Sequence, residues 1–306
     1  MDVIEHLQVQ PMLNKAYQPT TIDPNRLLIG IASVEIDGVD LGSMTQASVE
    51  VTSTTKERYQ GYPANRMETI VEAVTAITSI SAEEIGSAVV LTLLSNLFRD
   101  LNVELAQQYA ISMLAPFAGG GNLKLAANVK MLPELSISWR DSWNTLSFKF
   151  ECIGTNVQTL IAKTIDNGVR KPAVTTDVKN LSIGLPQIQV EGVSIGAIQG
   201  ADLSLQGTAK KIGTSYPKVT KDVIYETSKF ELTILAEETA LPALADCRVT
   251  LIQAILDNKF IAIEFPHCSI LEDLTYSAQN DWSGRKYVVK PFKLNKDTEI
   301  VILTRG

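Results

Sequence analysis

One stretch of this sequence occurs twice. It reads KERYQGYPANRMETIVE from Lys56 to Glu72, and KKIGTSYPKVTKDVIYE from Lys210 to Glu226, 154 residues further on. Both versions carry Tyr-Pro at the same place and close on Ile-x-Glu. The correspondence runs without a gap from Ala32 to Glu84, over 53 positions with fourteen identities. A register held over that length predicts a duplicated structural unit, because chance matches between two β-rich segments are short.

Composition sets wide limits on what the chain can be. With 306 residues, 45% of them hydrophobic and 20% charged, it has the length for two domains and an ordinary globular make-up. The net charge of −7 disfavours tight, unspecific attachment to DNA or to an anionic membrane. Its three cysteines, an odd number, indicate no disulfide framework. The start of the chain does not read as a signal peptide.

Each copy predicts strands joined by tight turns. VEIDGVDLG (Val34–Gly42) lies over IQVEGVSIG (Ile188–Gly196), and both alternate apolar and polar residues before turning at an acidic residue and Gly. Two long strands then flank each Tyr-Pro, where proline suits a bend because it fixes φ and lacks a donor. We therefore expect two long hairpins. The turn motif is Gly38, Gly42, Gly192 and Gly196, and the hairpin-tip motif is Tyr62, Pro63, Tyr216 and Pro217.

Each copy also predicts one packed helix. Ser81, with Glu84 three residues later, resembles a capping box ahead of the apolar run Ile85–Leu101. In the second copy the segment Ala240–Asn258 predicts a shorter helix interrupted by Pro242. Trp143 and Trp282 are only 139 residues apart, so the first copy holds 154 − 139 = 15 extra residues. Pro and Gly residues place them in an inserted loop at 107–122.

The fold expected from these elements is mainly β, in the α+β sense, with two tandem β-sandwich or barrel domains. Each domain has a long hairpin and one packed helix. The boundaries follow the composition: an N-terminal arm at 1–26, a first domain at 27–160 containing the loop 107–122, a linker at 161–180, and a second domain at 181–306.

No catalytic, cofactor or metal motif emerges from the sequence. Only His6 and His267 are available for a catalytic triad, and neither accompanies a G-x-S-x-G segment. His267 and Cys268 are neighbours on a predicted strand, so their side chains point to opposite faces and do not share a metal ion. FAGGGNLK (Phe117–Lys124) lacks the spacing of a phosphate loop. Capping at a helix start explains the acidic pairs Glu83-Glu84 and Glu237-Glu238.

ASVEIDGVDLGSMTQASVEV (Ala32–Val51), followed by a long hairpin, a helix and a closing strand pair, resembles the tail tube proteins of tailed bacteriophages. These proteins are similar in fold to the tube proteins of contractile injection systems and type VI secretion. The resemblance covers roughly 27–154 and 181–306, and its most specific motifs are the turns Asp37–Gly42 and Glu191–Gly196. In this family, domains form rings with six-fold symmetry that stack into a tube. Most members carry one domain per chain, so the two domains here imply a ring of three chains.

The resemblance implies a virion protein that is made in the host cytoplasm and forms a negatively charged conduit for DNA. The implied partners are copies of itself, the tape measure, baseplate or initiator, terminator and, in contractile tails, sheath proteins. The arm and the loop 107–122 would bridge rings. Polar faces of the hairpins supply candidates for the lumen lining, although the same pattern also fits solvent-facing residues of a sandwich. The candidates are Glu50, Thr52, Glu68, Glu72, Asp202, Ser204, Asp222 and Glu226.

A binding module of another class remains the alternative: a duplicated β-sandwich adhesin or carbohydrate-binding protein. Such modules present exposed aromatic residues on a sheet face, and aromatic residues are only 6% of this chain. Composition therefore favours the tube protein.

Overall fold

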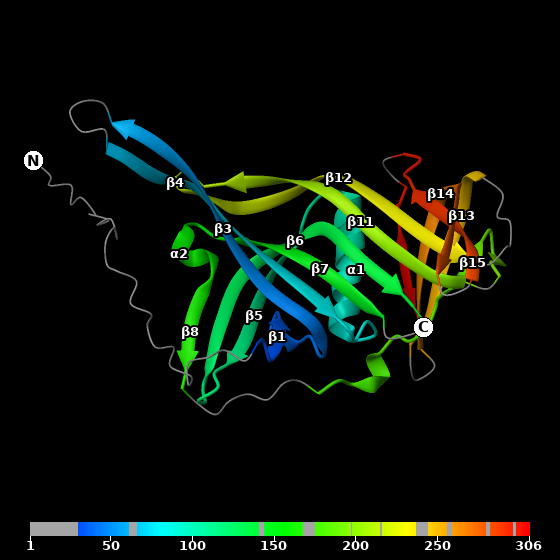
Figure 1. Cartoon of the computed structure of the whole chain (residues 1–306), viewed down its shortest axis with the longest axis horizontal. Helices are drawn as coiled ribbons and strands as arrows, with labels where there is room; N and C mark the ends of the chain where they lie inside the picture. The colour runs from blue at the N-terminus through cyan, green and yellow to red at the C-terminus, as the bar shows by residue number, and fades with distance from the viewer. Residues whose placement is uncertain are drawn as a thin grey trace, which may run out of the picture.

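The computed structural model describes residues 30–60, 66–140, 144–167, 175–196, 198–214, 216–236, 244–255, 259–279, 282–295 and 298–306, with the backbone alone at 58–60, 66–68, 272–279 and 282–285. The fold is mainly β, as the sequence predicted, and its strands join into one large mixed sheet. In Figure 1 the N-terminal strands lie to the left, β13 to β15 lie to the right, and helix α1 lies in the middle.

Eight strands and two helices lie in the described residues of the first half. They are β1 (Ser33–Ile36), β2 (Val39–Asp40), β3 (Met44–Gln60), β4 (Arg66–Ala82), α1 (Ala88–Val103), β5 (Gln108–Pro116), β6 (Asn122–Trp139), β7 (Thr145–Ile153), α2 (Val157–Leu160) and β8 (Ala162–Asp166). A short 3-10 helix at Val178–Asn180 follows before the second half.

In the second half the described residues form eight further strands. They are β9 (Gln187–Val190), β10 (Val193–Ser194), β11 (Ile198–Gly213), β12 (Lys218–Ala236), β13 (Leu244–Ile255), β14 (Lys259–Gln279), β15 (Trp282–Pro291) and β16 (Ile302–Arg305).

The strand pairings of the first half recur in the second. The first half runs β2-β1-β5-β6-β7-β4-β3, with β8 added beside β6. The second runs β10-β9-β13-β14-β15-β12-β11, with β16 added beside β14. Each strand of one half therefore has a counterpart in the other with the same neighbours, in the same order along the chain.

The hairpins β3–β4 and β11–β12 also share their register and irregularities. Glu50 pairs with Ile77, and Ser204 pairs with Glu231, so both strands keep the offset: 204 − 50 = 154 and 231 − 77 = 154. The ladder of β3 and β4 is interrupted at Met44/Gln46 and Thr54/Thr55, and that of β11 and β12 at Ile198/Gly200, Thr208/Ala209 and Ile212/Gly213. Adding 154 to the two sites of the first hairpin gives the first two of the second, and the irregularity at Ile212/Gly213 has no counterpart. Bulges are features that a strand pair retains, so the ungapped sequence match is also a structural match.

Helix α1, the one helix of more than four residues in the described part, begins later than predicted. Ser87 is the N-cap of α1 and its Oγ accepts from the Val90 N–H, whereas Ser81 lies inside β4. Most of the apolar face of α1 is buried, and Phe98 packs edge-to-face on Phe230 of β12 with ring centroids 5.9 Å apart. The helix therefore packs against both halves of the chain.

Two predictions about the second copy and the insertion are wrong. The segment expected to be a second helix is strand β13, and its buried residues alternate strictly at Cys247, Val249, Leu251, Gln253 and Ile255. That period of two, with β-branched residues, suits a strand and not a helix.

The predicted inserted loop at 107–122 is mostly strand β5, followed by the turn that leads into its antiparallel partner β6. The extra residues of the first copy lie earlier, because 25 residues (83–107) join β4 to β5 and only seven (237–243) separate β12 from β13. Those seven lie outside the described residues, and they are too few for a counterpart of the 16-residue α1.

Candidate assembly surface

The two halves meet edge to edge, at a contact that we call the junction. Strand β6 of the first half pairs antiparallel with β11 of the second, from Ala201 opposite Trp139 to Gln206 opposite Glu134. Figure 1 shows β11 and β12 reaching from the second half across the first. Backbone pairing makes the sheet continuous from β3 through β4, β7, β6, β11 and β12 to β15 and β14.

Side chains reinforce the junction. Arg140 contacts both carboxylate oxygens of Asp202 at 2.9 and 2.8 Å, and the Ser138 hydroxyl donates to the same carboxylate at 2.5 Å. Deeper in, the buried Tyr225 hydroxyl donates to the Met131 carbonyl at 2.8 Å, which crosses from β12 to β6. A planar guanidinium held in two contacts fixes orientation as well as distance.

A cluster of alternating charges closes the inner part of the junction. The Glu151 carboxylate is fully buried and accepts from Lys211 Nζ and from Thr220 Oγ1, each at 2.7 Å. Beside it, Lys130 Nζ lies 2.5 Å from Asp222 Oδ1, and this hydrogen bond is the main reason that the pKa of Asp222 is lowered. Each pair joins the first half to the second, so the charges on the two halves are complementary here.

The counterpart of the junction is unfilled in a single chain. By the repeat, β3 of the first half corresponds to β11 of the second. The segment 271–279 of β14 corresponds to the part of β6 that pairs with β11. Within the described residues β3 pairs only with β4, and the segment 271–279 of β14 pairs only with β15. We call these two stretches the open edges. Val51 is 58% exposed, whereas Leu205, its counterpart in the junction, is 1% exposed.

The sheet face that points away from the core is rich in hydroxyl groups. One row of directly paired residues runs across five neighbouring strands and through the junction. We name it the hydroxyl row, and its members are Ser81, Ser147, Ser136, Ser204 and Glu231. The Oγ atoms of Ser81 and Ser147 are 2.7 Å apart. The sequence analysis singled out only Ser204 of this row, because cross-strand neighbours from distant segments become visible only in the register.

Charged groups near the hydroxyl row are mostly compensated. Lys149 Nζ lies 2.6 Å from Glu134, and Lys229 Nζ lies 3.7 Å from Glu231. With Arg140 bound to Asp202, the three cations Lys149, Lys229 and Arg140 each have an acidic partner. The polarity of the face therefore comes chiefly from hydroxyl groups and paired ions.

The lumen-lining candidates of the first hairpin are only partly gathered on one surface. Glu50 and Thr52 are exposed and, two residues apart on β3, stand on the same face, opposite the partly buried Val49. Glu72 occupies the bulge of β4, between the partners of Thr54 and Thr55, and lies 3.7 Å from Lys56. The backbone of Glu68 belongs to β4, but its side chain lies outside the described residues.

The candidates of the second hairpin divide between two environments. Asp202 and Ser204 lie on the polar face, with Asp202 bound to Arg140. Asp222 is in the charge cluster of the junction. Glu226 occupies the bulge equivalent to that of Glu72 and is exposed.

The motifs at turns and tips lie as their residue types require. Asp37 and Gly38 have φ of 51° and 80°, and Glu191 and Gly192 have φ of 50° and 77°, so both turns use the left-handed region. Gly42 also has positive φ, at 86°, and Gly196 follows β10. Tyr216 and Pro217 form the end of hairpin β11–β12, as predicted, while Tyr62 and Pro63 lie outside the described residues.

Glu84 has a different role from the helix-start capping that the sequence suggested. Its buried carboxylate accepts from the backbone N–H of Ser43 at 2.8 Å and of Asp177 at 3.0 Å, and from the Asn180 amide at 3.3 Å. Glu83 accepts from the Ser43 hydroxyl. The pair therefore ties the segment before the second half to the start of β3, and α1 begins beyond it at Ala88.

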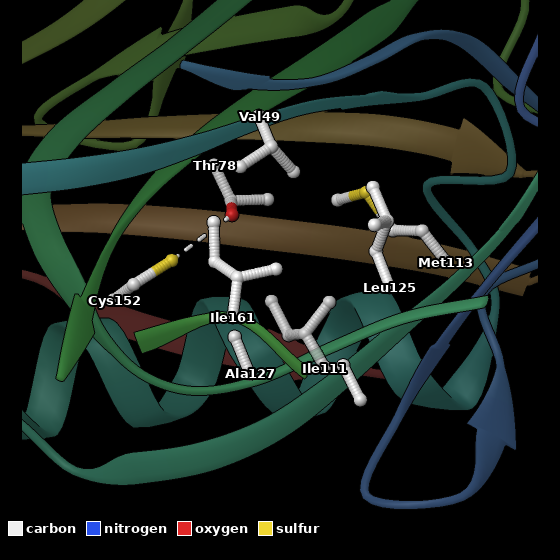
Figure 2. Close-up of a pocket in the computed structure, with 9 residues that line it drawn as sticks. Val49, Thr78, Ile111, Met113, Leu125, Ala127, Cys152 and Ile161 are labelled. Carbon is white, nitrogen blue, oxygen red and sulfur yellow. Dashed lines mark hydrogen bonds between the residues drawn. The ribbon is translucent and has the colours of Figure 1, made fainter. Parts of the chain in front are cut away.

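A small pocket inside the first half offers no catalytic arrangement. Figure 2 shows that it is lined mainly by aliphatic side chains, with Thr78 Oγ1 3.6 Å from Cys152 Sγ. Burial raises the pKa of the Cys152 thiol, which keeps it in the weakly nucleophilic protonated form. His267 Nδ1 lies 3.0 Å from Asp246, and Cys268 is fully buried away from it.

No group of three or more His, Cys, Asp or Glu side chains in the described part is arranged to hold a metal ion. No helix there combines the length and apolar character needed to cross a bilayer.

Comparison with known proteins adds no assignment. No family model matches the chain, and no curated protein matches it.

Proposed function

We propose that this protein is a structural subunit that joins copies of itself edge to edge into closed rings, which stack as the tail tube of a bacteriophage or a related particle. The observation that carries the proposal is the unfilled counterpart of the junction. Each chain contains one junction internally. At the two ends of its continuous sheet, on β3 and β14, it presents the two open edges that could form the same contact with other copies. Unpaired strand edges favour pairing with another chain, and closure of the sheet removes them.

The ring size follows from the repeat and from the resemblance to tube proteins. Six equivalent positions filled two at a time need three chains. Each chain contributes eight strands to the continuous sheet, from β3 to β14 in spatial order, so three chains give 3 × 8 = 24 strands. Such a contact is heterologous, because the edge offered by one copy differs from the edge that receives it, and heterologous contacts close into rings when the rotation allows.

The polar face suits a channel through which DNA passes. In a closed sheet whose apolar face is covered by the core, the hydroxyl row faces the other side. Hydroxyl groups and compensated ion pairs leave few free cations for the phosphate backbone, and release of counterions by free Lys and Arg is the main source of unspecific DNA affinity. We place the DNA conduit on this face, with Glu50, Thr52, Asp202 and Ser204 among its lining residues.

Electron microscopy of the purified protein, alone and with a tail initiator, tests the proposal at the level of particles. We expect rings or tubes. A monodisperse monomer that binds glycans would instead support a duplicated β-sandwich binding module.

A cysteine cross-link tests the contact itself. In the junction Asp202 pairs with Ser138, which also pairs with Thr145. By the repeat, Asp202 corresponds to Ser48 (202 − 154 = 48), and Thr145 corresponds to Gly284, whose strand partner is Ser277. Ser48 of one copy should therefore lie opposite Ser277 of the next. Mild oxidation of the variant with Ser48→Cys and Ser277→Cys should yield covalent dimers and closed trimers. The native cysteines are buried, so either single variant should stay monomeric on a denaturing gel.

A further inference from the structure

One ion pair of the junction's charge cluster, Lys211 with Glu151, has a counterpart in which the charges are reversed. Within the chain, the hairpin β11–β12 docks on the first half and supplies Lys211. Strand β7 of the first half supplies Glu151, and Lys211 Nζ lies 2.7 Å from Glu151 Oε2. Because Glu151 is fully buried, an acidic group in place of Lys211 would leave the buried carboxylate facing a like charge with no cation beside it.

The register identifies the corresponding residues in the open edges. Lys211 pairs with Val223 and Glu57 pairs with Thr69, so Lys211 corresponds to Glu57 at the offset of 154. On the receiving side, Thr78 pairs with Phe150 and Leu232 pairs with Val289, which gives β7 and β15 an offset of 289 − 150 = 139. Glu151 therefore corresponds to Lys290.

Both counterparts are available for a partner. Glu57 is exposed and Lys290 is partly exposed, and neither forms an ion pair within the part of the chain that the structure describes. At the neighbouring positions the numbers of acidic and basic residues also stay equal. Glu68 corresponds to Asp222, Arg66 to Thr220 and Ser269 to Lys130. The set in the open edges then has two acidic and two basic residues: Glu57, Glu68, Arg66 and Lys290.

We infer that Glu57 of one copy forms an ion pair with Lys290 of a second copy, and that the reversal of this pair relative to Lys211 and Glu151 forces the halves to alternate around the assembly. This inference rests on the proposed function, since it specifies the partner and the register of the open edges. Either hairpin could in principle dock on either half, which gives four possible contacts. Only two of these contacts bring opposite charges together.

The two wrong matches are opposed by like charges. If the first hairpin docked on another first half, Glu57 would meet Glu151, and if the second hairpin docked on another second half, Lys211 would meet Lys290. Placing like charges at a contact is a recognised way to exclude a competing partner. A duplicated chain needs such a device, because both of its hairpins otherwise fit both of its receiving edges.

Charge-reversal variants test the inference. Glu57→Lys and Lys290→Glu should each reduce ring formation at least about tenfold, judged by sedimentation and negative-stain microscopy, because each places like charges at every contact between chains. The double variant Glu57→Lys/Lys290→Glu should restore rings. Lys163→Glu, an equal charge change on the exposed strand β8, is the matched control and should assemble like the wild type.

Mixing the two single variants gives a second, independent readout. Contacts between unlike variants are complementary, but a ring of three must contain at least one contact between like variants. We therefore expect open chains in which the two variants alternate, and no closed rings of three, from the mixture.

Thermal unfolding of each variant shows whether it is folded. Folded single variants that form rings like the wild type, or a folded double variant that does not recover them, would overturn the inference while leaving the proposed function standing. A wild-type protein that stays monomeric contradicts the proposed function and the inference together.

Discussion

Single side chains hold the two halves of this chain together, and Tyr225 is the clearest case. It is 3% exposed, and its hydroxyl donates to the Met131 carbonyl across the junction. Its counterpart by the repeat, Val71, has no such group and is 40% exposed. One position of the repeat therefore holds a buried donor where a partner half covers it, and an aliphatic residue where no half does.

Replacing Tyr225 by Phe should destabilise the chain by about 1 kcal/mol, because the buried Met131 carbonyl loses its hydrogen bond. Urea unfolding of the unassembled protein measures this. Tyr216→Phe, at a 60% exposed position, should change the free energy of unfolding by much less. Equal effects of the two substitutions would mean that the Tyr225 bond contributes nothing.

The buried thiols and phenols predict a loss of stability at alkaline pH. Burial raises the pKa of Cys152, Cys247 and Cys268, and raises that of Tyr109 to about 12. The folded chain keeps these protons while the unfolded chain loses them, so stability is full below the ordinary pKa values and falls as pH rises above about 8.5. The urea midpoint should therefore drop between about pH 8 and about pH 10.

Thiol titration provides the complementary check. A thiol reagent at about pH 8 should find no reactive cysteine in the folded protein and all three in urea, because the thiolate is the reactive form and burial suppresses it. A rapidly reacting thiol in the folded chain would contradict this account.

Among the elements, strand β13 best illustrates what sequence reasoning missed. The long hairpins, the tight turns at Asp37 and Glu191 and the helical character of 88–101 were all predicted from pattern and residue type. Strand β13 was not, since its apolar residues are dense enough to fit either period until one face is seen to be buried. The capping role of Ser81 failed for a related reason: β4 continues through it, and Ser87 stands where the chain leaves the sheet.

The junction strands also predict a position at which no side chain fits. A Cβ on Gly207 of β11 would lie 2.6 Å from the Thr227 carbonyl oxygen and 2.7 Å from Pro133 of β6. Gly207→Ala should therefore cost about 1–3 kcal/mol, since the junction strands must move apart. Ser53→Ala, at the equivalent exposed position of β3, is the control and should leave the stability of the unassembled chain nearly unchanged. Urea midpoints of both variants decide the comparison.

For the whole molecule, the repeat was the feature of the sequence that predicted most of the architecture. The fixed offset identified the two halves, and the shared bulges and strand order show how completely the structure follows it. The polar face was anticipated only in part, because the hydroxyl row is assembled from four serines of β4, β7, β6 and β11 and from Glu231 of β12, which carry no common local signature. The charge reversal likewise becomes visible only after the register relates Glu57 to Lys211 and Glu151 to Lys290.

Helix α1 has a practical consequence for imaging. It occurs once per chain, so a tube of three-chain rings would display it at alternate positions around the circumference. Averaging such a tube with six-fold symmetry would superimpose α1 on a place where no equivalent exists and weaken its density by half. Three-fold averaging should recover the helix at full strength.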